Sequence, residues 1–168
     1  MIVLSLVLPT SGGRQGSVLG GGEVISSDEG LQVAIQAGGG IHVEVGDDHA
    51  PYSTTPPTSG SHYEIPLEDI TWGALAEPVE NEIQVSYLER GGIMMQYNCL
   101  IDCPELIQQL EGVVGRHPEA VVLAPYPDMG STIALTAWGW IDTFESFDDS
   151  RVEDFIQRHI GKGPQSFR

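Results

Sequence analysis

Residues 104–124, PELIQQLEGVVGRHPEAVVLA, contain a helix pattern followed directly by a strand pattern. Pro104 suits the first turn of a helix, where its missing N–H group costs no hydrogen bond. Apolar residues then recur at helical spacing and predict an amphipathic helix over residues 104–115: they are Leu106, Ile107, Leu110, Val113 and Val114. Residues 120–124 form a short apolar run, which predicts a strand.

The regions on either side extend this pattern. Residues 132–140 predict another strand, and residues 151–161 predict a second amphipathic helix. Upstream, apolar and polar residues alternate with period two, which predicts a hairpin and a further pair of strands, or one strand bent at its glycines: 31–36 with 41–45, and 83–87 with 93–97. We therefore expect an α+β domain with a mixed or antiparallel sheet, a β-rich N-terminal half and two helices in the C-terminal half.

The composition of the chain limits the classes of partner. Its 168 residues are enough for one domain with a hydrophobic core. The chain has 24 acidic and seven basic residues, and a formal net charge of −17. This charge would repel nucleic acid and anionic membrane surfaces. It leaves a cationic partner, a metal ion or simple solvation of acidic faces as alternatives.

The N-terminal segment predicts a division into three parts: an apolar arm (1–10), a glycine-rich tether (11–22) and a single domain (23–168). Residues 1–8 are too few to cross a bilayer as a helix, so we expect no transmembrane helix in this chain. The arm is apolar on both faces of a predicted strand through Ile2, Val3, Leu4, Leu6, Val7 and Leu8. It is the remnant of a signal or anchor, a strand folded back on its own domain, or a strand donated to a neighbouring copy.

The chain has two cysteines, Cys99 and Cys103. An even number of cysteines in an acidic, lysine-poor chain predicts a disulfide formed in an oxidising compartment. A pair of thiolate metal ligands is the alternative, although a structural zinc site needs four ligands. We expect an extracytoplasmic location, either secreted or on the cell surface.

A stiff loop precedes His62. Two prolines restrict the backbone, and a Thr-Ser-Gly turn then places a histidine beside a tyrosine. We assign a structural role to Pro56, Pro57, Ser59, Gly60, Tyr63 and Arg90. We predict that His62 is buried next to Glu89 or Arg90, where it forms a structural ion pair, takes part in acid–base chemistry or binds a metal.

Four motifs in the same order resemble the bacterial domain-of-unknown-function family 3105: Pro56–Tyr63, Val85–Ile93, Tyr97–Cys99 with Cys103–Pro104, and Leu135–Gly139. The resemblance covers about residues 41–164 and implies a domain outside the cytoplasm. It also implies that His42 and His62 match histidines of the family and that Glu89 is retained. Ser86 and Arg90 stand where the family has its other two histidines. A site of copper or zinc at His42, His62 and Glu89 is therefore expected to be weak or absent here, and we expect no cofactor.

We expect a non-catalytic interaction module that assembles with copies of itself, as a ring or filament, or docks in an envelope complex. A copper- or zinc-binding protein and an enzyme acting at the same cleft are the alternatives. Three further histidines show no grouping in the sequence: His49, His117 and His159. We expect His49 to be solvated. Trp138 and Trp140 are expected to project from one face of a strand.

Overall fold

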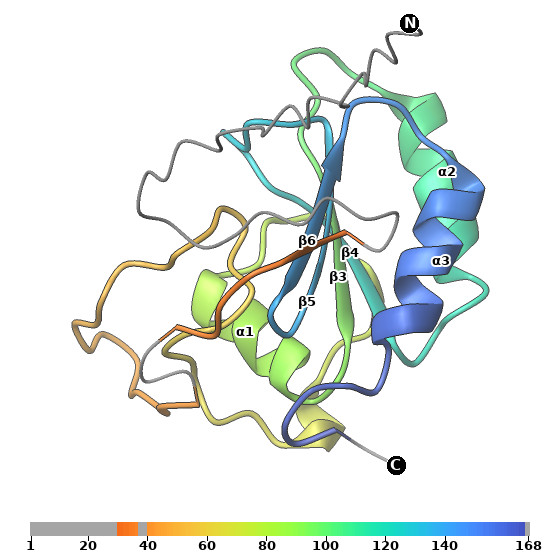
Figure 1. The fold of residues 1–168 in the computed structure, drawn as a ribbon. Coiled ribbons are helices and arrows are strands. Elements are labelled where there is room, and N and C mark those ends of the chain that lie inside the picture. Colours follow the sequence, from red (N-terminus) through yellow and green to blue (C-terminus); the bar gives the residue numbers. More distant parts are fainter. Residues whose placement is uncertain (1–29, 37–39, 167–168) are drawn as a thin grey trace, which may run out of the picture.

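The computed structural model describes residues 30–36 and 40–166 (Figure 1). The expected arm (1–10) and tether (11–22) lie outside these residues. The described elements, in chain order, are β1 (Leu31–Gln32), the short 3-10 helix η1 (Leu67–Asp69), β2 (Gly73–Ala74), α1 (Asn81–Glu89), β3 (Ile93–Tyr97), α2 (Pro104–Val114), β4 (Val121–Pro125), β5 (Ile133–Ala137), β6 (Trp140–Phe144) and α3 (Asp149–His159).

The strands form one mixed sheet of six strands in the order β1-β6-β5-β3-β4-β2. β3 is parallel to β4, and β4 is parallel to β2. β5 pairs antiparallel with β3, and β6 and β1 continue the antiparallel half of the sheet. The order β3, α2, β4 is therefore a β-α-β unit at the centre of the fold. This arrangement confirms the expected α+β class.

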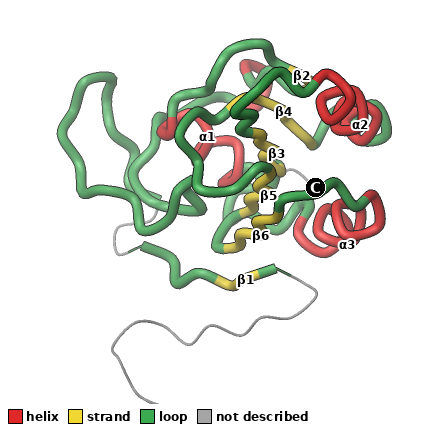
Figure 2. Tube along the Cα trace, turned by 90° about the horizontal axis from the view of Figure 1, so that it is seen from above, coloured by secondary structure: helices red, strands yellow, loops and turns green. Residues whose placement is uncertain are grey.

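The helices cover the two faces of the sheet, with α1 on one face and α2 and α3 on the other (Figure 2). Ile93, Leu123 and Phe155 are among the buried residues of the larger core cluster, on the α2 and α3 side. Leu88, Met94 and Val122 belong to the smaller cluster beside α1, where Trp72 also packs. Each large buried aliphatic or aromatic side chain contributes about 1.5–3 kcal/mol. The positions of α2 and α3 confirm the two helices expected from the sequence.

The segment that we expected to be a strand at residues 83–87 is helix α1 instead. Its apolar residues alternate in the sequence, but the last six residues of the helix, 84–89, are all buried. A helix that is buried on most of its circumference needs no polar face, so the usual 3.6-residue pattern is lost. The prediction of a strand at this position is wrong for that reason.

Two other strand predictions also need correction. Residues 132–140 form β5 and a turn into β6, and Gly139 has a φ of 74° in that turn. Trp138 and Trp140 therefore do not share a face, because Trp138 packs beside the α1 cluster and Trp140 against the α2–α3 cluster. The expected hairpin of 31–36 with 41–45 does not form. The described N-terminal half has two-residue strands joined by long loops rather than a β-rich layer.

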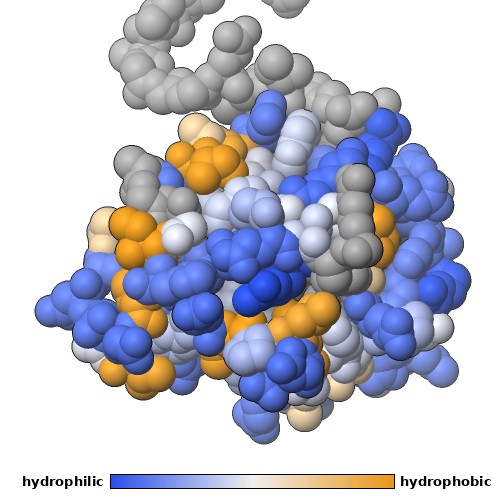
Figure 3. Space-filling model, turned by 90° about the horizontal axis from the view of Figure 1, so that it is seen from below, coloured by the Kyte–Doolittle hydropathy of each residue, from blue (hydrophilic) through white to orange (hydrophobic). Residues whose placement is uncertain are grey.

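The surface seen from below in Figure 3 is mostly hydrophilic, with smaller separate hydrophobic patches. Such a surface is consistent with the net charge of −17. Among the helices of the described residues, none has the length and apolar character needed to cross a membrane.

Candidate functional site

His42 and His62 are brought together by their main chains. The amide of Val43 donates to the carbonyl of His62 at 2.9 Å, and the amide of His62 donates to the carbonyl of Ile41 at 3.1 Å. These two bonds form a parallel β-bridge between segments that are 20 residues apart in the sequence. The two imidazole rings then meet edge to face, with their centroids 5.0 Å apart.

The loop before His62 is buried and held by hydrogen bonds, as its stiffness predicted. Ser59 Oγ accepts a hydrogen bond from the amide of Gln36 at 3.0 Å, and the carbonyl of Thr58 accepts one from Gly139 at 2.9 Å. Gly60 has a φ of 133°, and a Cβ atom there would lie 2.9 Å from the ring of Tyr52. Both observations require glycine at this turn. Pro56 and Pro57 are also buried, so the loop is part of the folded core.

Glu89 is the last residue of α1, and its side chain is 5% exposed. Its main-chain carbonyl accepts a hydrogen bond from the amide of Gln165 at 3.0 Å. The amide of Gly161 donates to the carbonyl of Gly91 at 2.8 Å. The segment after α3 therefore fixes the end of α1 and, with it, the position of the Glu89 carboxylate.

The side chains of His42, His62 and Glu89 converge on one point. Glu89 Oε2 lies 3.0 Å from His62 Nε2 and 3.5 Å from His42 Nε2. One ligand atom from each of the three residues lies within 4.8 Å of the others. His62 is fully buried, and within residues 30–36 and 40–166 its Nε2 atom has no hydrogen-bond partner, although it lies 3.0 Å from Glu89 Oε2. A buried polar atom without a partner is costly and calls for an explanation.

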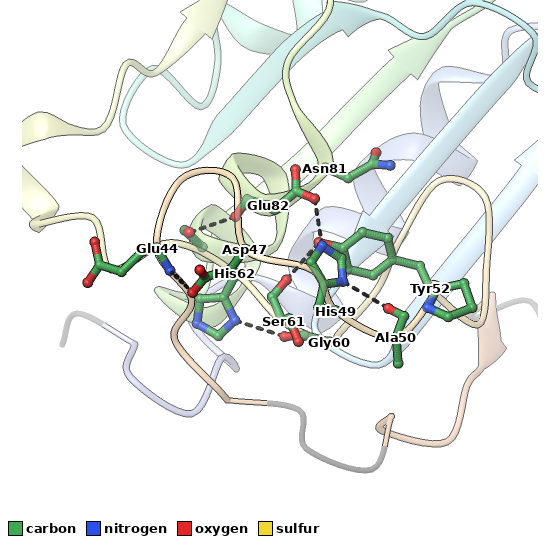
Figure 4. Close-up of polar contacts among 12 residues, drawn as sticks. Glu44, Asp47, His49, Ala50, Tyr52, Gly60, Ser61, His62, Asn81 and Glu82 are labelled. Carbon is green, nitrogen blue, oxygen red and sulfur yellow. Dashed lines mark hydrogen bonds and ion pairs between the residues drawn. The ribbon is translucent and has the colours of Figure 1, made fainter.

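The other nitrogen of His62 defines the state of the ring. Nδ1 lies 2.9 Å from the carbonyl oxygen of Gly60, and Figure 4 shows this contact. A carbonyl only accepts, so Nδ1 carries the proton. In the neutral ring, Nε2 then presents its lone pair toward the carboxylate of Glu89. The lone pair of His62 Nε2 and the negatively charged Glu89 Oε2 then face each other at a distance of 3.0 Å. Either a second proton on the ring or a cation between the groups resolves this arrangement.

The geometry fits a metal ion in the second case. Nitrogen and oxygen ligands lie about 2.0–2.2 Å from zinc, so two tetrahedral ligand atoms are about 3.4 Å apart. The distances from Glu89 to the two histidines, 3.0 and 3.5 Å, bracket this value. The Nδ1–H bond of His62 to Gly60 is the kind of outer contact that orients metal-binding histidines. The side chain of His42 is 33% exposed and offers a route from solvent.

Ser86 and Arg90 both contact the loop around the site. The Ser86 hydroxyl lies 2.5 Å from the carbonyl oxygen of Tyr63, so it holds the segment after His62 against α1. Arg90 Nη2 donates to the carbonyl of Ile65 at 3.1 Å. Among the described residues, no ion pair joins Arg90 to Glu89. The carboxylate is therefore directed to the two histidines. His62 was predicted to be buried next to Glu89 or Arg90, and the structure places it next to Glu89.

Sequence reasoning missed a second histidine contact. His49 Nε2 lies 2.8 Å from Glu82 Oε1, and Nδ1 lies 2.8 Å from the carbonyl of Ala50, as Figure 4 shows. The expectation that His49 is solvated is therefore wrong. Its partner is 33 residues away on α1, and nothing in the local sequence indicates the pairing. His117 similarly contacts Glu153 at 2.9 Å, and His159 is buried beside Trp140 and Phe155.

The contact of His49 with Glu82 predicts a pH effect on stability. The hydrogen bond to Glu82, followed by that to Ala50, raises the pKa of His49 above its ordinary value of 6.5. Its stabilising contribution is present in full below that ordinary value and is lost as the pH rises through the raised pKa. We expect His49→Gln to lower the free energy of unfolding more at about pH 5 than at about pH 9. Urea unfolding of both proteins at the two pH values measures this.

The matched control for that prediction is Glu82→Gln. In a Glu82→Gln background, His49→Gln should lose most of its pH-dependent effect, because the hydrogen bond that is the largest cause of the raised pKa of His49 is gone. An effect of His49→Gln that is equal at both pH values would contradict the prediction.

The remaining site residues of the sequence analysis fall into two groups. Cys99 and Cys103 form a disulfide, as predicted. The arm residues of the expected assembly contact lie outside the described part of the chain: they are Ile2, Val3, Leu4, Leu6, Val7 and Leu8.

The comparison with known families gives one match. The sequence model described as Protein of unknown function (DUF3105) matches residues 42–167. No curated protein and no solved structure matches the chain. The matched region contains the three converging residues and both cysteines, and it confirms the resemblance recognised from the sequence motifs.

Proposed function

We propose that this chain, which belongs to the DUF3105 family of proteins of unknown function, binds one divalent transition-metal ion, zinc or copper, through His42, His62 and Glu89. The observation that carries the proposal is the fully buried Nε2 of His62, which has no hydrogen-bond partner in the part of the chain that the structure describes and faces a carboxylate 3.0 Å away. A metal ion would accept the lone pair of His62 Nε2 and would also be coordinated by the carboxylate of Glu89.

The ligand set selects the class of ion. Imidazole nitrogen suits zinc and copper, whereas calcium and magnesium require oxygen ligands. Two histidines and one glutamate leave a fourth position for water or another small ligand, as in zinc sites with an open coordination position. Glu64, with Oε2 at 3.7 Å from His42 Nδ1, can orient the more exposed histidine from outside.

Metal titration of the purified chain tests the proposal. We expect one zinc or copper(II) ion per chain by calorimetry and elemental analysis, with little binding of magnesium. His62→Ala should weaken binding about 100-fold or more, because a buried ligand with its oriented ring is removed. His117→Ala is the matched control, since it removes a histidine that contacts a carboxylate elsewhere, and it should leave the affinity unchanged.

A second measurement uses the stability of the fold. An ion that binds only the folded chain, at about 100 times its Kd, should raise the free energy of unfolding by about 2.7 kcal/mol, and His62→Ala should abolish this gain. If the wild-type chain binds neither zinc nor copper, the metal proposal is wrong.

We further propose self-assembly as a second function, through donation of residues 1–8 to a neighbouring copy. The edge of the sheet supports this idea. β1 pairs only with Trp140 and Ile141 of β6, so among the described strands the rest of β6 has one partner, β5. A strand can add to such an uncovered edge by main-chain hydrogen bonds. Such assembly would give a ring or a filament. The disulfide supports a location outside the cytoplasm, because disulfides persist in oxidising compartments.

Deletion of residues 1–10 tests the assembly proposal. Light scattering should give a larger mass for the full chain than for the truncated chain. Equal masses would show that the arm does not join copies, and would leave the metal proposal unaffected.

A further inference from the structure

The disulfide lies at a chemically distinctive place in the fold. Cys99 follows the carboxyl end of β3 after a single residue, and Cys103 is the N-cap residue of α2, directly before Pro104. The pair therefore occupies the junction between the first strand and the helix of the central β-α-β unit. In Figure 1, this junction lies at the top of the sheet. Dithiol redox motifs of the Cys-x-x-Cys type also lie beside a β-α-β unit, although the pair here has one more residue between its cysteines.

A groove opens beside the disulfide. It has a volume of about 500 Å³, and both cysteines line it, together with Tyr97, Ile101, Ile107 and Pro125. Tyr97 and Pro125 end the paired parallel strands β3 and β4. In sheets of this type, ligands bind outside the carboxyl ends of the parallel strands. The sulfur atoms thus border a largely apolar groove at the edge of the sheet where binding is expected.

The residues between the cysteines are unusually exposed. Leu100 is 97% exposed and Ile101 is 84% exposed. Ile101 also lines the apolar groove, so its exposed side chain indicates a surface that is covered when a partner binds, whereas Leu100 does not line the groove. A crosslink with only a structural role requires neither the groove nor these side chains.

We propose that Cys99 and Cys103 form a thiol–disulfide exchange site, which oxidises a cysteine-bearing polypeptide segment bound in the groove. The disulfide at the wall of the groove identifies the reactive group of the partner as a thiol, and the apolar lining indicates a polypeptide rather than a small polar thiol. The net charge of −17, with Asp102 lining the groove, favours a partner with positive charge near its cysteines.

The exchange balances in two steps. A thiolate of the partner attacks Cys99 Sγ, the Cys99–Cys103 bond breaks, and Cys103 leaves as a thiolate. The start of α2 stabilises a thiolate at Cys103, although Asp102 and Glu105 nearby oppose this effect. A second thiolate of the partner then attacks its own sulfur in the mixed disulfide, and Cys99 is released. Two electrons pass from the partner to the cysteine pair. The two thiols of the partner lose two protons, and the thiolates of Cys99 and Cys103 each take up one.

The test uses the oxidised full chain and a reduced synthetic peptide with two cysteines flanked by lysines. Alkylation and mass measurement should show two new thiols per chain, together with an oxidised peptide. We expect the peptide to react about tenfold faster than glutathione at equal thiol concentration, because only the peptide can fill the groove. A peptide with a single cysteine should instead stop at the mixed disulfide with Cys99, because it has no second thiol to release itself, and alkylation of the freed Cys103 thiol should trap this adduct.

Two neighbouring variants provide the matched control. Ile101→Ser removes a side chain that lines the groove, whereas Leu100→Ser removes an exposed side chain outside it. Ile101→Ser should slow the reaction with the peptide about tenfold and leave the reaction with glutathione unchanged, while Leu100→Ser should affect neither. The proposal is wrong if the two-cysteine peptide reacts no faster than glutathione, or if the single-cysteine peptide forms no mixed disulfide with Cys99. The bond would then be a structural crosslink only.

Discussion

Replacing Gly163 by alanine is expected to lower the free energy of unfolding by about 3 kcal/mol or more. A Cβ atom at Gly163 would overlap the carbonyl oxygens of Glu89 and Leu88 and the amide nitrogen of Gly91. All three are main-chain atoms, so no side chain can rotate away. The segment after α3 must then separate from the end of α1. The same displacement should weaken metal binding through Glu89. Urea unfolding and metal titration measure the two effects.

Gly112→Ala is the matched control for this experiment. Gly112 lies inside α2, and a Cβ atom there would meet nothing within 4 Å. Alanine should therefore stabilise the chain by about 0.5–1 kcal/mol through its better helix propensity. If Gly163→Ala changes the free energy of unfolding as little as Gly112→Ala does, the C-terminal segment does not pack closely on α1.

Replacing Phe155 by alanine should cost about 3–5 kcal/mol of the free energy of unfolding. Phe155 is 1% exposed in the core between the sheet and α3. Its ring lies 4.5 Å from the ring of His159, and it also closes over Gly30, where a Cβ atom would lie 3.0 Å from it. The substitution therefore leaves a cavity and loosens the segment that leads into β1. Thermal and urea unfolding both report the loss.

The control for that substitution is Gln157→Ala on the exposed side of the same helix. It changes no core packing, so its effect should stay within about 0.5 kcal/mol. A loss of less than about 1 kcal/mol for Phe155→Ala would contradict its place in the core.

The helices α2 and α3 could be predicted from the sequence because each has one buried and one exposed face. Leu110 and Val113 in α2, and Val152 and Phe155 in α3, recur at the spacing of one helical face. Helix α1 could not be predicted, because burial from residue 84 to residue 89 removes the polar face that makes a helix recognisable. The alternation of Ile83, Val85 and Tyr87 therefore predicted a strand where none exists.

The candidate site could be predicted in part. The stiff loop and the carboxylate of Glu89 led to the predicted contact of His62 with Glu89. The placement of His42 depends on a main-chain bridge to His62, 20 residues further along the chain, which only the fold provides. The contact of His49 with Glu82 was missed for the same reason, because the loop that brings them together has no periodic pattern.

The contact between the C-terminal segment and the end of α1 also bears on the order in which the chain is made. During translation, the three site residues leave the ribosomal exit tunnel well before residues 161–165. The main chain of that later segment contacts residues 88–91. Domains generally fold as units as they emerge during synthesis. The end of α1 therefore lacks its last supports until residue 165 has left the exit tunnel. In a nascent chain arrested before that point, the Glu89 carboxylate should not yet have a fixed position. The side chains of His42, His62 and Glu89 should therefore converge only late in translation.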